Sequence, residues 1–403
     1  MAAIAPSPGF LLQKRLLPNP KLPNLKLSNP QQRAPLLKPS PLRSLQSGSW
    51  FKLICGASYQ DLPAVRNLTL AYALAGADCI DVAADLAVIS AAKEGLEVAK
   101  QLAKAHSRPY QQPWLMVSMS AGEDPHFRKA WFDPKVCPAD CPRPCENICP
   151  ASAIASTGGI IRDRCYGCGR CLPVCPLGLI EARSQPTTID AIARQVLTQA
   201  DALEIHTQVG QLAAVKTLWQ SIAAHTTHLQ LMSVSCPDSA GYISYLKDLQ
   251  QLMGISPEIS PSKPFFGLSS HQNVQNVMWQ TDGRPMSGDI GKGTTHAAIR
   301  LAQKVIESDV VGFIQLAGGT NQYTVQKLKK LGLLGRSSEN VQNGYKIGDR
   351  VVSGIAYGSF ARHLLMPIIS ETLYLEEVSP MLWKAVAIAE SLVKPLKQSV
   401  VSK

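Results

Sequence analysis

The sequence of 403 residues contains no apolar run that approaches the ~18 residues needed to span a bilayer. We therefore expect no transmembrane segment and a soluble mature protein. The sequence also lacks a Ser-His-Asp arrangement or a pair of carboxylates that would point to one particular reaction. The chemistry of this chain must be sought in other residues.

Acidic residues are missing from the first 49 positions, which contain seven Lys or Arg, nine Pro and six Ser. A basic, Ser-containing stretch without acids is typical of an organellar transit peptide, and the Pro content disfavours the amphipathic helix of a mitochondrial presequence. We expect residues 1–49 to be a plastid transit peptide and the mature protein to reside in the chloroplast stroma. The competing interpretation is a disordered basic tail that binds an acidic partner.

The positive charge of the chain resides mostly in this leader. The whole chain has a net charge of +11, whereas the residues after position 49 include 33 basic and 29 acidic side chains. Such a small excess removes the main support for binding to nucleic acid, and we expect no nucleic-acid partner.

Cysteines are sparse outside one short region. Eight of the eleven fall within 39 positions at short, regular spacings, and the other three are Cys55, Cys79 and Cys236. This crowding favours metal or cluster ligation in a reducing compartment over disulfides.

The second group of cysteines matches the C-x2-C-x2-C-x3-C-P spacing of bacterial two-cluster ferredoxins at every position. In that pattern three thiolates surround one 4Fe-4S cubane, while the fourth ligates the other cluster. Gly167 and Gly169 allow close turns of the backbone and direct amides toward the cluster sulfurs. The group consists of Cys165, Cys168, Cys171 and Cys175.

The first group departs from this spacing by one extra residue in each of its first two gaps, although a looser loop can still bring three thiolates to one cubane. The crossed pattern assigns cluster 1 to Cys137, Cys141, Cys145 and Cys175. It assigns cluster 2 to Cys165, Cys168, Cys171 and Cys149. A zinc site or a single cluster is the competing interpretation, but four-cysteine zinc sites usually use two separated C-x2-C pairs.

The two groups also resemble each other beyond the cysteines. Cys149-Pro-Ala-Ser-Ala-Ile in the first half corresponds to Cys175-Pro-Leu-Gly-Leu-Ile in the second. We expect an internally duplicated, ferredoxin-like segment.

Eight short apolar or β-branched runs alternate with helical stretches on either side of the cysteines. The expected strands span residues 51–57, 79–84, 114–119, 202–206, 229–234, 277–281, 310–316 and 351–357. The expected helices span residues 62–75, 86–105, 189–199, 211–224, 241–253, 294–307, 323–331 and 380–397. Eight βα units in this length predict a TIM-like (β/α)8 barrel, with a doubly wound open sheet as the other architecture.

The ferredoxin-like insertion, residues 133–185, falls between the third strand and the third helix. The barrel is accordingly expected to comprise residues 50–132 and 186–403. Because βα loops form the C-terminal face of such a barrel, where active sites lie, we expect the clusters to lie over the barrel mouth.

Glycine-rich loops follow the seventh and eighth strands, where many barrels bind a phosphate. The candidate phosphate-binding residues are Gly318, Gly319, Gly358 and Ser359, and the loop 281–294 with Arg284 and Lys292 would also suit an anion. A phosphate beneath two clusters would most naturally belong to FMN. Simple turn glycines are the competing interpretation. Lys52, Glu204 and His206, which lie on expected strands, we interpret as core residues with satisfied hydrogen bonds.

The motif from Cys137 to Cys149, with Cys-Pro-Arg-Pro-Cys-Glu at its centre, and the motif Asp-Arg-Cys-Tyr-Gly-Cys-Gly-Arg-Cys-Leu-Pro-Val-Cys-Pro at 163–176 resemble the light-dependent period protein LdpA family of cyanobacteria. Residues 48–58 and 76–85 fit the same family. The resemblance implies an iron-sulfur protein that relays the redox state set by photosynthetic electron flow to the circadian clock. The leader departs from the family and suggests a plant or algal relative in the plastid, where the clock partners cannot be assumed.

Two functions therefore compete. One is a redox relay or sensor that exchanges electrons with an electron-transfer protein or a quinone-linked partner. The other is an iron-sulfur flavoprotein oxidoreductase with FMN in the barrel. A third possibility is that the clusters only stabilise a scaffold.

Overall fold

The computed structural model describes residues 40–122, 127–149, 151–155, 159–184, 189–255, 276–284, 291–334 and 351–398. All of them belong to one compact unit, residues 37–403. Most of the predicted leader, residues 1–39, lies outside the described residues.

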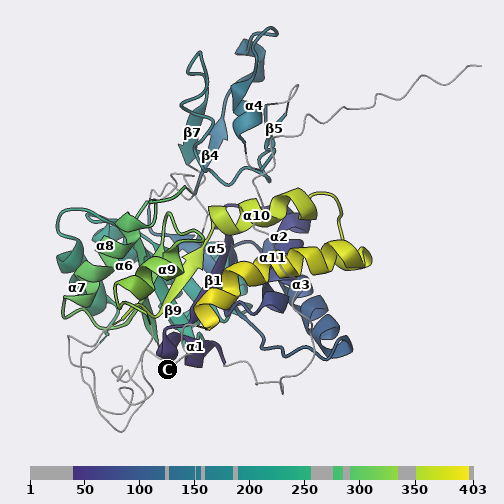
Figure 1. The fold of residues 1–403 in the computed structure, drawn as a ribbon. Coiled ribbons are helices and arrows are strands. Elements are labelled where there is room, and N and C mark those ends of the chain that lie inside the picture. The colour runs from purple at the N-terminus through teal and green to yellow at the C-terminus, as the bar shows by residue number, and fades with distance from the viewer. Residues whose placement is uncertain are drawn as a thin grey trace, which may run out of the picture. The chain divides into compact units, whose positions relative to one another are not determined.

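Eight parallel strands close into a barrel in the order β1-β12-β11-β10-β9-β8-β3-β2 (Figure 1). Their bounds are β1 (Trp50–Gly56), β2 (Cys79–Ala83), β3 (Trp114–Ser120), β8 (Ala202–His206), β9 (Leu231–Pro237), β10 (Val277–Asp282), β11 (Phe313–Ala317) and β12 (Gly354–Tyr357). All eight expected strands are present. Pairing of the first strand with the last, with Leu53 opposite Tyr357, closes the sheet and confirms the TIM-like barrel over the open sheet.

Helices surround this barrel. They are α2 (Leu62–Ala75), α3 (Leu86–Ala105), α5 (Ile189–Leu197), α6 (Leu212–Ile222), α7 (Tyr242–Leu252), α8 (His296–Ile306), α9 (Thr324–Lys330), α10 (Ser359–Ile369) and α11 (Ser379–Lys397), with short 3-10 turns at Ala223–His225 and Leu375–Glu377. The predicted bounds of α2 and α3 are correct because strong signals fix both starts. Asp61 accepts a hydrogen bond from the amide of Ala64 at 3.2 Å, and Asp85 accepts one from the amide of Ala87 at 2.9 Å.

Helix α10 is the one barrel helix that the sequence pattern missed. The sequence analysis predicts residues 380–397 as the helix that follows the eighth strand, whereas α10 follows β12 directly and α11 is an additional helix. Pro367 lies inside α10 and has the sequence signature of a helix breaker.

A short helix, α1 (Pro41–Ser47), lies within the residues assigned to the leader. Its Leu45 is fully buried and joins Trp50, Met116 and other side chains at the N-terminal end of the barrel strands. Lys397 of α11 donates to the Ser44 hydroxyl at 3.1 Å. The folded part of the chain therefore begins before the boundary that was predicted at residue 49.

The cysteine-rich insertion leaves the barrel after β3 and returns to it at α5, so it occupies the third βα loop as predicted. Its stem is the antiparallel pair β4 (Arg128–Trp131) and β7 (Glu181–Ser184). It also contains a 3-10 turn at Pro134–Val136, α4 (Pro144–Ile148) and the pair β5 (Ile154–Ala155) and β6 (Gly159–Ile160) (Figure 1).

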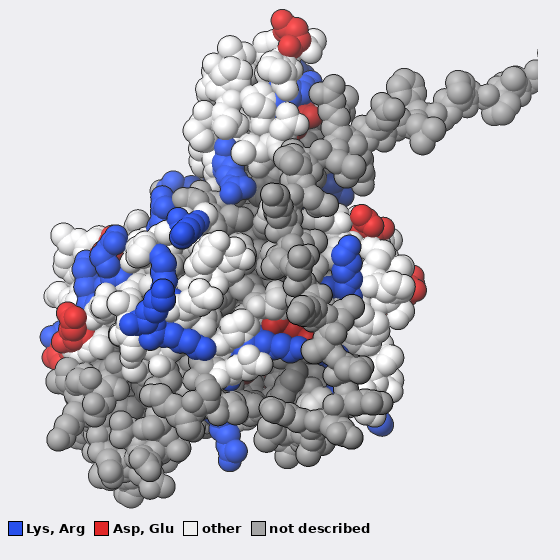
Figure 2. Space-filling model, viewed as in Figure 1, with Lys and Arg blue, Asp and Glu red and all other residues white. Residues whose placement is uncertain are grey.

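Among the described residues, none of the helices combines the length and the apolar character needed to cross a bilayer. On the face shown in Figure 2, the Lys and Arg side chains of the described residues form several separate groups and no continuous basic stripe.

Candidate functional site

The four cysteines assigned to cluster 2 line a single cavity in the insertion, of about 460 Å³ and partly open to solvent. Burial raises the pKa of the Cys171 thiol to about 12, and the charges of three neighbouring thiols contribute to this shift. These neighbours are Cys149, Cys165 and Cys168. Cys149 thus lies beside the second sequence group, which is the arrangement that crossed ligation requires. A cavity bounded by four thiols fits a 4Fe-4S cubane.

The cysteines assigned to cluster 1 lie on the other half of the insertion. Burial raises the pKa of the Cys145 thiol, and the charge of Cys175 contributes although Cys175 belongs to the second group. Arg143, whose pKa is raised by its ion pair with Glu146 at 2.9 Å, also senses the charges of Cys137 and Cys141. Cys175 of the second group thus lies near Cys145 of the first, which agrees with the crossed assignment. No three Cys, His, Asp or Glu side chains of the described residues lie close enough together to surround a single metal ion.

The two halves of the insertion repeat the same local backbone path. The Cys149 sulfur accepts a hydrogen bond from the amide of Ala153 at 3.2 Å, and the Cys175 sulfur accepts one from the amide of Leu179 at 3.3 Å. Three residues after each cysteine, Ser152 and Gly178 both adopt the left-handed conformation, with φ of 46° and 61°. This repetition agrees with the internal duplication expected from the sequence.

Backbone amides around the sulfurs stabilise negative charge. Burial alone would raise the pKa of the Cys175 thiol, but the amides that follow it, led by that of Leu179, lower the pKa below its ordinary value. Gly167 and Gly169 have φ of 71° and 73°, a left-handed conformation that favours glycine. The expected tight turns between the cluster 2 cysteines are therefore present.

The cluster 2 half of the insertion packs on the barrel. The Tyr166 ring meets the Tyr59 ring edge to face, with centroids 5.7 Å apart. The Arg362 guanidinium of α10 lies 4.0 Å from the centroid of the Tyr166 ring. Lys129 on β4 is 5% exposed and donates to the Gln60 side chain at 2.8 Å. These contacts attach the loop of cluster 2 to the C-terminal end of β1 and to α10.

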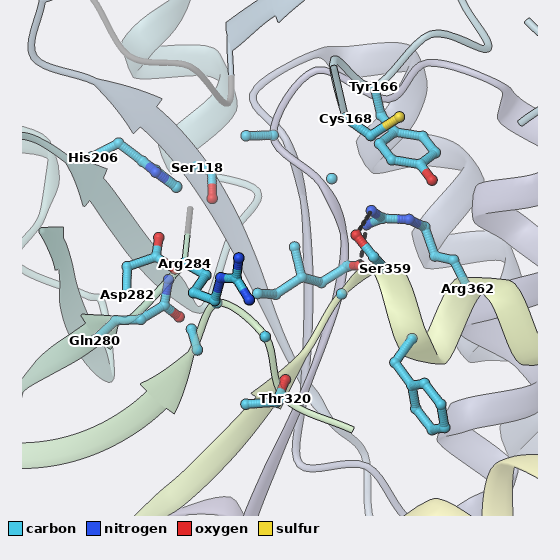
Figure 3. A pocket seen from close by; sticks show the side chains of 18 of the residues that line it. Ser118, Tyr166, Cys168, His206, Gln280, Asp282, Arg284, Thr320, Ser359 and Arg362 are labelled. Carbon is cyan, nitrogen blue, oxygen red and sulfur yellow. Dashed lines mark hydrogen bonds between the residues drawn. The ribbon is translucent and has the colours of Figure 1, made fainter. Parts of the chain in front are cut away.

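A second cavity, the mouth pocket, lies at the C-terminal ends of the barrel strands and has about 780 Å³ of space, partly open to solvent. All four candidate phosphate-binding residues line it, together with two arginines (Figure 3). They are Gly318, Gly319, Gly358, Ser359, Arg284 and Arg362. The structure therefore brings the loops after strands seven and eight to one site, and Lys292 is not among its lining residues.

Packing within the protein already explains two of these glycines. A Cβ atom on Gly318 would lie 2.6 Å from the amide nitrogen of Arg284, and one on Gly319 would lie 2.6 Å from the carbonyl oxygen of Thr294. Both residues also have positive φ, of 67° and 92°. Gly318 and Gly319 are required by the turn itself, so the case for an anion rests on Ser359 and the two arginines.

Buried charged groups form the floor below this pocket. Lys52 is fully buried, pairs with Glu204 and lies 3.1 Å from the Asp81 carboxylate. Burial alone would raise the pKa of Glu204, but Lys52 and His206 lower it below its usual range. Burial alone would lower the pKa of Lys52, yet the two carboxylates raise it above its ordinary value. Lys52 therefore stays positively charged as the buried partner of two carboxylates, in agreement with its interpretation as a core residue.

Hydrogen bonds from neighbouring strands complete the floor. Ser118 donates to Asp81 at 2.7 Å, and Ser233 and Gln280 donate to Glu204 at 2.8 and 2.9 Å. Glu204 and His206, also expected to be core residues, line the mouth pocket as well, with an Nε2–Oε1 distance of 3.2 Å between them. Their alternation on one strand predicts a shared face, but no sequence signal identifies Lys52 on β1 as the partner of Glu204 on β8, a strand that does not pair with β1.

The three cysteines outside the insertion are buried. Burial raises the pKa of the Cys55 thiol to about 12. A thiol of this kind is a core residue and a poor nucleophile.

The chain matches two family profiles. Residues 137–186 match the LdpA Fe-S cluster-binding domain, and residues 196–395 match the light dependent period A C-terminal domain. It is 50% identical over 365 residues to light dependent period A of Synechococcus elongatus, which covers 89% of this chain and 94% of that protein. An uncharacterised ferredoxin of Methanocaldococcus jannaschii is 31% identical over 88 residues, which covers 18% of this chain and 53% of that protein.

The electron transport protein HydN of Escherichia coli is 39% identical over 46 residues, covering 11% of this chain and 26% of that protein. Among solved structures, a tryptophan synthase from M. tuberculosis is similar with a TM-score of 0.36 and 12% identity, covering 91% of this chain and 100% of that one. The identity and coverage shared with the Synechococcus protein, together with the two matched domains, show that the chain belongs to the light dependent period A family.

Proposed function

We propose that this iron-sulfur protein carries two 4Fe-4S clusters and acts in electron transfer or redox sensing linked to photosynthetic electron flow. The observation that carries the proposal is the placement of Cys149 from the first group beside Cys165, Cys168 and Cys171 of the second group around one cavity. The influence of Cys175 on Cys145 agrees with a second, crossed set. The link to photosynthesis is supported by the family, whose Synechococcus member is named for light dependence. An electron-transfer protein or a quinone-linked carrier would supply the electrons.

Each cluster supplies one-electron chemistry when bound. The chain holds it with four thiolates and donates backbone hydrogen bonds to the sulfurs, as Ala153 and Leu179 do. The contacts of Tyr166 with Tyr59 and Arg362 fix the cluster 2 loop on the barrel.

Iron content tests this proposal directly. We would express the chain from Leu37 onward under anaerobic conditions, so that α1 is retained, and measure iron, zinc and acid-labile sulfide. Two cubanes require about eight iron and eight sulfide per chain. About four iron per chain, or zinc in place of iron, would contradict the two-cluster assignment.

We further propose that the residues before α1 direct the protein to the chloroplast stroma and are then removed. Because Leu45 and Ser44 are buried, the mature N-terminus should lie before Ser40. N-terminal sequencing of the protein from isolated chloroplasts tests both points. A mature chain that begins at residue 50, or one found only in the cytosol, would contradict them.

A second candidate function is an iron-sulfur flavoprotein oxidoreductase with FMN in the mouth pocket. It is favoured by the convergence of Ser359, Arg284 and Arg362 on one pocket whose wall includes Cys168. Anaerobically purified protein should then release about one FMN per chain on denaturation. Protein with a full complement of iron and no flavin would argue against this function and leave the first one intact.

A further inference from the structure

The mouth pocket and the cavity of cluster 2 share a wall. Tyr166 and Cys168 line both cavities and so stand between them. None of the four described cysteines assigned to cluster 1 lines either cavity. A molecule in the mouth pocket would therefore be separated from cluster 2 by one layer of residues and would lie farther from cluster 1.

A buried positive charge lies at this wall. Arg362 is 5% exposed and donates to the carbonyl oxygens of Ile54 and Cys55 at 2.8 and 2.9 Å. Its other terminal nitrogen lies 3.4 Å from the Ser359 hydroxyl, and its guanidinium lies against the Tyr166 ring (Figure 3). Its buried Nε has no hydrogen-bond partner among the described residues. Arg362 thus touches the cluster 2 loop on one side and faces the pocket on the other.

The pocket is lined by side chains of both charge signs. Arg284 and Arg362 are basic residues of the lining, whereas Glu204 and Asp282 are acidic residues of the lining. Lys52 pairs with Glu204 and offsets its charge. The buried guanidinium of Arg362 therefore has an anion-binding role open to it at this pocket.

Electrostatics couple such a molecule to the cluster. Reduction adds one negative charge to a cluster, and a buried cation beside it stabilises that charge more strongly than a cation in water would. An anion bound to Arg362 offsets the cation and so disfavours the reduced cluster. Because coupling between two sites is reciprocal, reduction of the cluster must weaken binding of the anion by the same factor.

We propose that the mouth pocket binds a small phosphate- or carboxylate-bearing molecule beside Arg362, and that it does so more tightly when cluster 2 is oxidised than when it is reduced. The inference rests on the proposed function, since it requires a cluster held by Cys149, Cys165, Cys168 and Cys171. One electron passes from the electron-transfer partner, which is oxidised, to cluster 2, which is reduced. The anion then leaves for solvent with no covalent bond made or broken.

A fixed charge in the pocket tests the coupling without knowledge of the natural ligand. Ser359→Asp places a carboxylate beside the guanidinium at the first turn of α10, where an acidic residue is compatible with the helix. Ser359→Asn is the matched control of similar shape without charge. EPR-monitored redox titration of the whole chain measures both clusters, with the signals assigned by Cys168→Ser and Cys141→Ser.

The charged variant should lower the reduced-to-oxidised ratio of cluster 2 about tenfold at a fixed potential, which is 59 mV for a one-electron couple. The reduction potential of cluster 1 should not change. In Ser359→Asn, the potentials of both clusters should match those of the unmodified chain. An absent shift, an equal shift of both clusters, or the same shift in Ser359→Asn would overturn the coupling.

Calorimetry with inorganic phosphate and with FMN as probes tests the binding site itself. Oxidised protein should bind at least one probe about tenfold more tightly than electrochemically reduced protein. Arg362→Lys should retain the difference and Arg362→Gln should abolish it. Equal affinity in both states, or no binding in either, would overturn the site. If Arg362→Gln loses iron, the comparison of Ser359→Asp with Ser359→Asn decides whether the coupling exists. A shortage of iron in the unmodified chain would instead count against the proposed function.

Discussion

The two halves of the insertion share the backbone geometry around their cysteines but differ in what surrounds them. Around Cys149 and Cys175 they share an amide-to-sulfur hydrogen bond and a left-handed residue three positions on. The half of cluster 2 packs on the barrel through Tyr166, which is 9% exposed. The half of cluster 1 presents Val136 and Leu177, which are 54% and 56% exposed and lie beside two of its cysteines.

This difference assigns separate roles to two copies of one structural unit. Local hydrogen bonds determine how each half holds its sulfurs, while the surroundings determine what each half can contact. We therefore expect an electron from the partner protein to enter at cluster 1, the outer cluster, and to reach cluster 2, the inner cluster beside the mouth pocket. Each prediction below changes one half and compares it with the other.

Loss of a ligand should have the largest effect. Cys168→Ser and Cys141→Ser should each reduce the iron content from about eight to about four per chain, because each removes one ligand of one cubane. Only Cys168→Ser should also loosen the insertion on the barrel, measured as faster proteolysis of the stem β4–β7. Equal proteolysis of the two variants would contradict the proposed division of roles.

Removal of the ring that joins insertion and barrel should rank second. Tyr166→Ala should lower the free energy of unfolding by about 3 kcal/mol, since it leaves a cavity beside Tyr59 and Arg362. Hydrogen exchange should report the loss in β1 and α10. Trp131→Ala on the stem is the control. Trp131 is 40% exposed and its ring lies against the Arg183 guanidinium, so its removal should cost less than about 1 kcal/mol.

The two left-handed positions provide a smaller, matched comparison. Gly178→Ser should cost about 1 kcal/mol through backbone strain alone, because a Cβ atom there would have nothing within 4 Å. Ser152→Gly should be neutral or stabilise the chain by up to about 0.5 kcal/mol, since relief of strain is partly offset by the entropy of glycine. Chemical unfolding of the cluster-loaded protein measures both. A cost for Ser152→Gly as large as that for Gly178→Ser would show that the halves are not equivalent.

A substitution on the exposed surface beside cluster 1 should have the smallest effect on stability. Leu177→Ser should change the free energy of unfolding by no more than about 0.5 kcal/mol, as is usual for a surface position. It should nevertheless slow reduction of the protein by a reduced plant-type ferredoxin several-fold in stopped-flow measurements. An unchanged rate would exclude this surface as the entry point for electrons from that donor.

Much of this arrangement could be predicted from the sequence because its signals are local. Apolar runs and helix caps such as Asp61 and Asp85 define the barrel units, and cysteine spacing predicts the two sets of thiols. Helix α1 carried a readable signal as well, since Ser40 followed by Pro41 is a common helix start. The basic, acid-free composition before it outweighed that signal.

The rest depends on contacts between distant parts of the chain. Arg362 stacks on Tyr166, and Lys52 pairs with Glu204, across separations that no periodicity reports. Gly318 and Gly319 show the opposite limitation, because a packing requirement and a phosphate loop leave the same glycines in the sequence. Only the residues around them separate these interpretations.

Closure of the barrel between β1 and β12 has a consequence for the order in which the protein matures. The last strand ends at Tyr357 and Arg362 follows it. The barrel cannot close, and Tyr166 cannot pack against Arg362, until nearly the whole chain has been synthesised. The eight cysteines between Cys137 and Cys175 leave the ribosome long before that. During synthesis they are therefore present before the last strand and Arg362 exist to complete the barrel and seat Tyr166.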